Sequence, residues 1–114
     1  MDTIGNLKIS EEVIVKIVGK SINEINGVSV AAGSEIMGII KSKIPYKGIK
    51  VEIKDNAVAI EASVVIDYGV KIVDITTQIQ ESVAKNIQDM CGMTVEKVDI
   101  VVSGINVDQK KEEE

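Results

Sequence analysis

The sequence predicts an α+β domain built on a mixed sheet of about five strands with two helices, in the order β-α-β-β-β-α-β. Three observations support this fold class. Ile and Val supply most of the apolar residues while Phe and Trp are absent, and β-branched side chains pack well on pleated sheets. Two stretches carry apolar residues at helical spacing. Two others alternate apolar and polar residues, as half-buried strands do.

The first helix is expected to follow a short strand at residues 5–9. Ser10 provides a hydroxyl for the N-cap, and Glu11 and Glu12 place negative charge in the first turn, where the helix dipole favours anions. The apolar stripe recurs at three- and four-residue steps and consists of Val13, Ile14, Ile17, Val18, Ile22 and Ile25. Gly27 is expected to end this helix as a C′ glycine.

A β-hairpin is predicted in the middle of the chain. Residues 49–54, IKVEIK, alternate apolar and charged side chains without a break. Asp55 and Asn56 form a two-residue turn, and the returning strand covers residues 57–66. Another strand is expected at residues 28–32. The connection at residues 33–47 is left open between a loop and a short helix at residues 34–42.

The second helix is expected to begin between Ile72 and Thr77, and Thr77 with Gln80 resembles a capping box. Its apolar stripe is Ile75, Ile79, Val83, Ile87 and Met90. Gly92 closes the helix, and residues 95–102 form the last strand.

The glycine of the Tyr68-Gly69 pair can either cradle a phosphate or let the chain turn between strand and helix. We expect the turn, with a positive φ. Gly27, Gly69 and Gly92 are therefore predicted to be structural joints.

The ends of the two predicted helices resemble each other. Residues 18–30, VGKSINEINGVSV, and residues 83–95, VAKNIQDMCGMTV, are identical at five of thirteen positions at a constant offset of 65. Shared helix-end chemistry and an internal duplication both explain this similarity.

Composition argues against several function classes. The chain has a net charge of -5 and no Arg, which disfavours nucleic acid as a partner. With no His and one Cys it lacks the usual ligands of a zinc site, and GSEIMGII has the glycine spacing of a phosphate loop without its Lys and Ser or Thr. No carboxylate pair is distinguishable from surface charge. The sequence therefore predicts no enzyme, no catalytic residues, no metal and no cofactor.

Length and hydropathy predict a single domain over residues 1–106 and a disordered acidic tail over residues 107–114. The sequence shows neither a signal peptide nor an apolar run long enough to span a bilayer. We expect a cytoplasmic chain without direct membrane insertion, in which Cys91 is an inert thiol.

Four segments resemble the alkaline shock protein family of Gram-positive bacteria, also described as envelope stress response proteins, over about residues 4 to 105. They are GNLKISEEVIVKIVGKSINEINGVSV, GIKVEI, DYG and QESVAKNIQDMCGMTVEKVDIVVSGI. The positions shared with the family are Gly5, Ile25, Gly27, Val28, Gly48, Val51, Tyr68, Gly69, Met90 and Gly92. The chain departs from the family at Cys91, which replaces Thr, and at Ile49, which replaces Val.

The resemblance implies a non-enzymatic protein of cell-envelope homeostasis or stress, which associates with itself and is recruited to the membrane by an anchored relative. The alternative from the residues alone is a small-molecule binding module or an enzyme whose site is invisible in sequence. Residues 33–47 carry more large apolar side chains than a solvated loop needs, so they either fold onto the sheet or form a partner surface. The predicted partner surface consists of Ile36, Met37, Ile40 and Tyr46.

Overall fold

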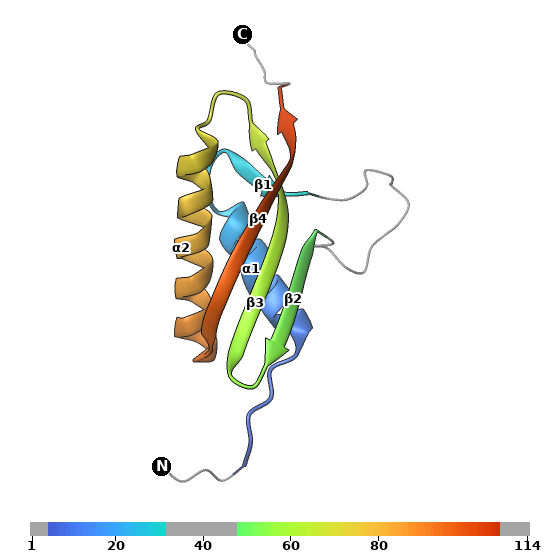
Figure 1. Ribbon diagram of the computed structural model, residues 1–114, viewed down its shortest axis with the longest axis vertical. Helices are drawn as coiled ribbons and strands as arrows, with labels where there is room; N and C mark the ends of the chain where they lie inside the picture. Colours follow the sequence, from blue (N-terminus) through green and yellow to red (C-terminus); the bar gives the residue numbers. More distant parts are fainter. Residues whose placement is uncertain (1–4, 32–47, 108–114) are drawn as a thin grey trace, which may run out of the picture.

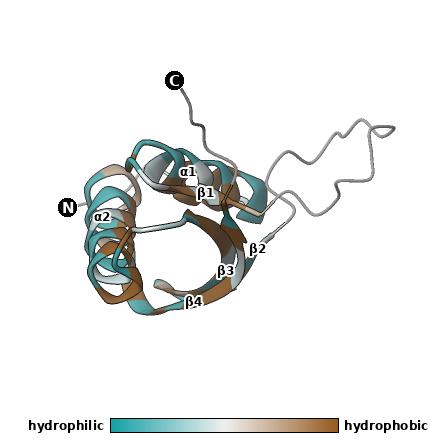
Figure 2. Cartoon of the chain, turned by 90° about the horizontal axis from the view of Figure 1, so that it is seen from above, coloured by the Kyte–Doolittle hydropathy of each residue, from teal (hydrophilic) through white to brown (hydrophobic). Residues whose placement is uncertain are grey.

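The computed structural model describes residues 5–31 and 48–107, which form two helices on one side of a curved four-stranded sheet (Figures 1 and 2). The elements are α1 (Glu11–Asn23), β1 (Val28–Val30), β2 (Ile49–Lys54), β3 (Ala57–Asp67), α2 (Ile72–Cys91) and β4 (Thr94–Asn106). The two helices run in roughly opposite directions (Figure 1). The predicted α+β class is confirmed.

The sheet is organised around β3, which pairs with the three other strands. β1 and β2 are antiparallel to β3, and β4 is parallel to it, so the sheet is mixed as predicted. The β3–β4 register shifts twice, between Val58 and Ala59 and between Val64 and Val65. These shifts leave one β4 residue unpaired at each position and bend the strand.

β1 and β2 lie end to end along the same edge of β3, and they meet at Ser63. The Ser63 N–H donates to the carbonyl of Gly48 at 2.9 Å, and the Ser63 carbonyl accepts from the N–H of Ala31 at 2.8 Å. Both backbone groups of one strand residue point to the same edge, so the ends of the two strands share it. A Cβ on Gly48 would lie 2.9 Å from the Ala31 oxygen, which is why glycine stands there.

The core lies between the helices and the inner face of the sheet (Figure 2). Every second residue of β3 from Val58 to Ile66 is buried, because side chains alternate between the two faces of a strand. The helices bury one stripe each: Ile14, Val18 and Ile22 on α1, and Ile75, Ile79, Val83 and Ile87 on α2. Both predicted stripes therefore supply the core, except for the exposed residues Val13 and Met90.

The predicted strand at residues 5–9 is wrong. These residues form no strand, and Leu7 is 79% exposed. Ile9 is instead half-buried against the core. It occupies the position before the N-cap, where an apolar side chain packs on the first turn of a helix. The described sheet consequently has four strands, and the element order begins with α1.

The Ser10 N-cap is confirmed, since its Oγ accepts from the N–H of Val13 at 3.3 Å. Gly27 does not occupy C′, because α1 ends at Asn23 and a turn separates the two residues. Asn23 instead connects helix and strand, its Oδ1 accepting from the Val30 N–H at 3.2 Å. Val13, assigned to the apolar stripe, is 46% exposed.

The second helix also differs in detail from the prediction. α2 begins at Ile72, so Thr77 lies inside it and donates to the carbonyl of Val73 rather than forming a capping box. Met90 is 70% exposed and does not belong to the buried stripe. Gly92 ends the helix in the left-handed conformation.

The hairpin of β2 and β3 has its predicted position, and β4 extends to Asn106, beyond the predicted end at residue 102. β1 ends at Val30, earlier than the predicted end at residue 32. The connection at residues 33–47, with Ile36, Met37, Ile40 and Tyr46, lies outside the described residues. So does nearly all of the predicted tail, from residue 108 onward.

Candidate interaction surface

A tight turn joins β3 to α2 at the end of the molecule where β4 also terminates. The N–H of Val70 donates to the carbonyl of Asp67 at 3.2 Å, and Gly69, the third residue of this turn, has a φ of 99°. Positive φ at the third position is typical of a type II turn and favours glycine. Nothing lies within 4 Å of a Cβ built on Gly69, so the backbone conformation alone explains this glycine.

Gly27 and Gly92, the other predicted joints, also have positive φ, 97° and 69°. Gly27 lies one residue before β1, and its carbonyl accepts from the N–H of Asp67 at 2.9 Å. Their role as joints stays a prediction that substitution can test.

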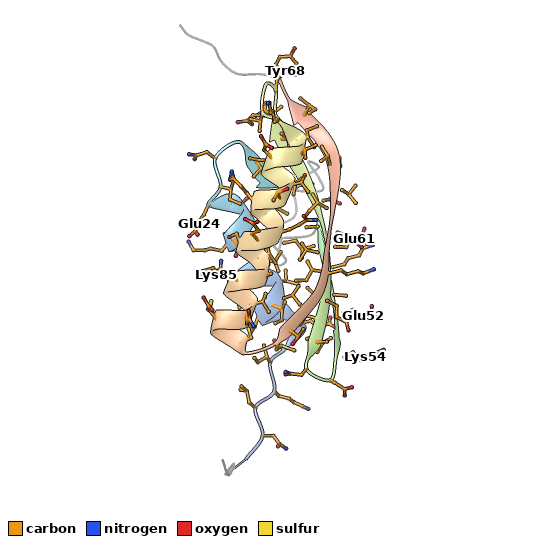
Figure 3. The ribbon with its side chains drawn as sticks, turned by 60° about the vertical axis from the view of Figure 1, so that its left-hand side comes forward. Glu24, Glu52, Lys54, Glu61, Tyr68 and Lys85 are labelled. Carbon is orange, nitrogen blue, oxygen red and sulfur yellow. The ribbon has the colours of Figure 1, made fainter. Side chains whose placement is uncertain are left out.

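Large apolar side chains gather at the end of the molecule that carries the β3–α2 turn. Five of the nine exposed large apolar residues in the described part of the chain lie there, and we call them the apolar end cluster: Tyr68, Ile72, Val73, Ile105 and Val107. The N–H of Tyr68 donates to the Asn106 carbonyl at 2.9 Å and ties the ends of β3 and β4 together. Tyr68 is 74% exposed and points away from the body of the molecule (Figure 3).

Charges of both signs border the apolar end cluster. Asp67, Lys71 and Asp74 are exposed beside it. Lys71 is the N-cap residue of α2 and makes no side-chain cap hydrogen bond. The ion pairs found in the described ranges all lie elsewhere: Glu12–Lys16, Lys20–Glu24, Lys85–Asp89 and Lys97–Asp99. The hydrogen bond from Lys85 to Asp89 raises the pKa of Lys85.

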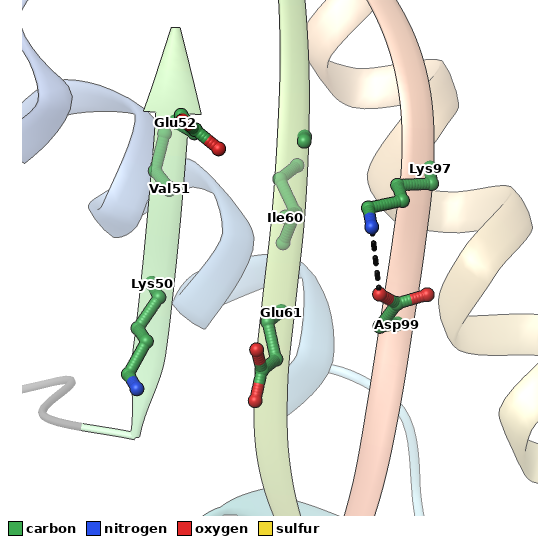
Figure 4. Close-up of a pocket in the computed structure, with 8 residues that line it drawn as sticks. Lys50, Val51, Glu52, Ile60, Glu61, Lys97 and Asp99 are labelled. Atoms are coloured by element: carbon green, nitrogen blue, oxygen red, sulfur yellow. Dashed lines mark ion pairs between the residues drawn. The ribbon is translucent and has the colours of Figure 1, made fainter.

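The outer face of the sheet, opposite the helices, carries a shallow depression of about 300 Å³ (Figure 4). Its charged residues come from three strands and have both signs: Lys50, Glu52, Glu61, Lys97 and Asp99. Lys97 and Asp99 form an ion pair, with Nζ 3.4 Å from Oδ2. Because these side chains are exposed to water, the depression lacks the enclosed apolar lining that small-molecule sites usually have.

Cys91 is half-buried at the end of α2, and burial raises the pKa of its thiol. The thiol is therefore protonated near neutral pH and a poor nucleophile. Within residues 5–31 and 48–107, no three His, Cys, Asp or Glu side chains come together as metal ligands. In the same ranges neither helix is both long and apolar enough to cross a membrane.

Sequence reasoning did not find the apolar end cluster. The sequence allows Tyr68 either to close the edge of the core or to donate its hydroxyl to a ligand, and its side chain is in fact 74% exposed, so it does not close the core. One signal was present, because Ile72 and Val73 precede the buried stripe that begins at Ile75. Apolar residues of a helix that lie off its buried stripe are candidates for exposure.

Comparison with known proteins places the chain in a family. The model of the alkaline shock protein 23 family, described as having a cell envelope-related function, matches residues 1–107. The chain belongs to the alkaline shock protein 23 family. The resemblance to the alkaline shock proteins is thereby confirmed.

Relatives occur in Bacillus and in Streptococcus. The uncharacterized protein YqhY of Bacillus subtilis (strain 168) is 28% identical over 113 residues, which cover 96% of this chain and 84% of YqhY. The uncharacterized protein Spy1614 of Streptococcus pyogenes serotype M6 is 32% identical over 108 residues, covering 90% of this chain and 89% of Spy1614. YloU of Bacillus subtilis, also uncharacterized, is 26% identical over 108 residues, or 90% of each chain. No solved structure is significantly similar to the chain.

Proposed function

We propose that this member of the alkaline shock protein family is a non-enzymatic interaction protein of cell-envelope homeostasis or stress response. It acts through self-association and through recruitment by a membrane-anchored partner. The family description supports the connection to the envelope. The observation that carries the interaction role is the apolar end cluster, with Tyr68 and Val73 each about three quarters exposed, at 74% and 76%.

Exposed apolar surface provides a driving force for an interaction. Covering apolar surface contributes roughly 25 cal/mol per Å². Single exposed apolar residues are common on proteins, whereas contiguous patches of a few hundred Å² are often functional. Five of the exposed large apolar side chains in the described part of the chain lie at one end of this small domain. The cluster is therefore better suited to a protein contact than to solvent.

Recruitment by a partner suits this surface better than direct binding to lipid. Asp67 and Asp74 are exposed beside the cluster, and their carboxylates are repelled by an anionic membrane surface. A surface that binds anionic lipid is typically rich in Lys and Arg at its border. The net charge of -5 acts in the same direction.

The non-enzymatic role is supported by the chemistry of the side chains. The whole chain lacks His, the residue that most often serves as a general base near neutral pH. The depression on the outer face of the sheet presents exposed charges of both signs to water.

A flotation experiment tests recruitment. The purified full-length chain is mixed with protein-free vesicles of the cell's own lipids, with native membranes, and with native membranes digested by protease. We expect the chain to float only with the undigested native membranes. Binding to protein-free vesicles, or equal binding to digested membranes, would contradict recruitment by a protein.

A further inference from the structure

β2 forms an edge of the sheet, and in the described part of the chain no strand pairs with its outer side (Figure 1). Building on the partner binding proposed above, we propose that an extended segment of another protein adds to this edge as a further strand. The segment carries an acidic, a basic and an acidic side chain at alternate positions, with β-branched apolar residues between them. Strand addition to a sheet edge is a common mode of peptide recognition.

The backbone of β2 presents hydrogen-bonding groups on its outer side. The Ser63 N–H donates to the Gly48 carbonyl at 2.9 Å, so these two residues form a hydrogen-bonded pair of the antiparallel ladder. Such pairs alternate along a strand, so the N–H and C=O groups of Ile49, Val51 and Ile53 point away from β3. These groups have no hydrogen-bond partner among the described residues. An added strand would supply their partners.

The other edges of the described sheet are less open. The register of β4 against β3 shifts twice, and Gln80 of α2 donates to the carbonyl of Val98 on β4 at 3.0 Å. Bulges and a covering element are features with which sheet edges avoid pairing with another strand. β1 has only three residues. β2 pairs with β3 over six residues without a register shift, so it is the edge best suited to a further strand.

The outer-face side chains of β2 determine which strand fits. Lys50, Glu52 and Lys54 alternate in sign, are exposed, and form no ion pair within the described ranges. Glu52 and Lys54 lie opposite Ala59 and Ala57, so β3 offers them no opposite charge directly across the pairing. Opposite charges in directly facing positions stabilise a strand pair, and like charges destabilise it. An added strand with acidic, basic and acidic residues in this order would therefore complement β2.

The inner face of this edge is apolar. Ile49 is buried, whereas Val51 and Ile53 are only half-buried beside the core. β-Branched residues of an added strand would continue this face and cover the part of Val51 and Ile53 that remains accessible. Lys side chains on an edge discourage indiscriminate pairing. The order of charges therefore selects the partner.

Fluorescence anisotropy with labelled peptides and the full-length chain tests the fit. The probe is the capped peptide Thr-Glu-Val-Lys-Val-Glu-Thr, and the control peptide, Thr-Lys-Val-Glu-Val-Lys-Thr, has every charge inverted. The charge order of the probe is the same in both directions, so the test does not depend on strand polarity. We expect the probe to bind about tenfold more tightly than the control, or better. Equal binding of the two peptides, or no binding of either, would overturn the proposal.

Val51→Pro tests the backbone contact. Proline removes the outward N–H of Val51 and leaves the β2–β3 hydrogen bonds in place, which is why it is tolerated on edge strands. We expect it to weaken probe binding by about tenfold or more. Val51→Ala shortens the side chain but keeps the N–H, so it should retain most of the affinity. Thermal melting establishes that both variants are folded. A folded Val51→Pro variant with the wild-type Kd would overturn strand addition.

A charge exchange tests the side-chain pairing independently of the backbone. Glu52→Lys should weaken binding of the probe and should instead favour the peptide Thr-Glu-Val-Glu-Val-Glu-Thr, whose central residue is acidic. Glu81→Lys makes the same change in net charge at an exposed position of α2 and is the control. It should leave probe binding unchanged. An equal loss with both variants would show an effect of net charge and overturn the pairing.

Sedimentation velocity of the chain alone identifies a second copy as the occupant, if there is one. A wild-type dimer that Glu52→Lys dissociates would overturn the assignment of this edge to another protein. The peptide measurements contain no membrane, so their failure is distinguishable from a failure of recruitment. Without probe binding, the chain can still float with native membranes, and the edge of β2 alone is wrong. With probe binding but no flotation, recruitment is wrong and the peptide site stands.

Discussion

The Nδ2 of Asn86 on α2 donates a hydrogen bond to the Oγ of Ser21 on α1 at 2.7 Å, and the two residues are separated by 65 positions. That separation equals the offset relating the two similar helix-end segments, so equivalent positions of the two segments touch each other. Ser21, the buried polar residue of the described core, also donates to the Ile17 carbonyl at 2.7 Å. The hydrogen bond therefore marks the crossing point of the two helices.

The strands that follow the two helices also occupy equivalent places, at opposite ends of β3. The Gly27 carbonyl, just before β1, accepts from the Asp67 N–H at one end of β3. The Thr94 N–H, at the start of β4, donates to the Asn56 carbonyl at the other end of β3. β1 runs antiparallel to β3 and β4 parallel, so β1 and β4 run in opposite directions. The two helix–strand units are thus arranged with approximate two-fold symmetry. This symmetry favours an internal duplication over convergent helix-end chemistry.

The Ser21–Asn86 hydrogen bond should couple the two helices energetically. We expect Ser21→Ala and Asn86→Ala each to lower the free energy of unfolding by about 1 kcal/mol, and the double variant to lower it by less than the sum. Urea denaturation of the four proteins measures this coupling. Strictly additive effects would show that the bond contributes nothing.

Gly69 should be required for its backbone conformation. With a φ of 99° and free space around a Cβ, Gly69→Ala meets no clash, so its cost arises from the strained φ alone. We expect a loss of roughly 1 to 3 kcal/mol in unfolding free energy. Gly5→Ala, which also has nothing within 4 Å of its Cβ but no positive φ, is the control. An unchanged melting temperature for Gly69→Ala would refute the joint, and lost anion binding at unchanged stability would indicate a phosphate site.

Gly48 should be required for space rather than for φ. A Cβ at this position would lie 2.9 Å from the Ala31 carbonyl oxygen. The backbone of Ala31 can move away from it only if the hydrogen bonds that join β1 and β2 at Ser63 are disturbed. We expect Gly48→Ala to cost about 2 kcal/mol and to speed hydrogen exchange at the Ser63 amide. Gly104→Ala, whose Cβ would meet Val65 at an ordinary 3.5 Å, should be nearly neutral. Equal stability of the two variants would argue against the close contact.

Substitution tests the predicted partner surface at Ile36, Met37, Ile40 and Tyr46. The double variant Ile36→Ser, Ile40→Ser should weaken assembly and leave the melting transition intact if these residues form an interface. Size measurement over a range of concentration, together with thermal melting, distinguishes a partner interface from a segment that folds onto the core. A loss of several kcal/mol in stability, as expected for buried Ile truncations, would assign the segment to the core.

The parts of the fold that were predictable depend on local patterns. The hairpin of β2 and β3 followed from unbroken alternation on both sides of Asp55-Asn56, and the α1 N-cap followed from Ser10 before two glutamates. The false strand at residues 5–9 had too few residues to distinguish a strand from an extended entry to a helix. Short apolar runs carry that ambiguity in any sequence.

The apolar end cluster was not predictable for a different reason. Ile105 pairs with the buried Ile66 across β3 and β4, yet it is 44% exposed. Its exposure depends on which parts of the sheet the helices cover, and that is a property of the assembled fold rather than of the local pattern. Met90 illustrates the reverse case, since the helical spacing that assigned it to the core continues past the last covered turn of α2.

Site-specific photo-crosslinking in living cells shows whether this alkaline shock family chain acts through protein contacts at its apolar end. p-Benzoylphenylalanine is introduced at Val73, or at Met90 as a control of similar exposure on the same helix, in cells that naturally express the chain. We expect a covalent adduct from position 73, with a second copy of the chain or with an envelope protein, and none from position 90. Irradiated cells that yield no adduct from position 73, or the same adduct from both positions, would contradict this expectation.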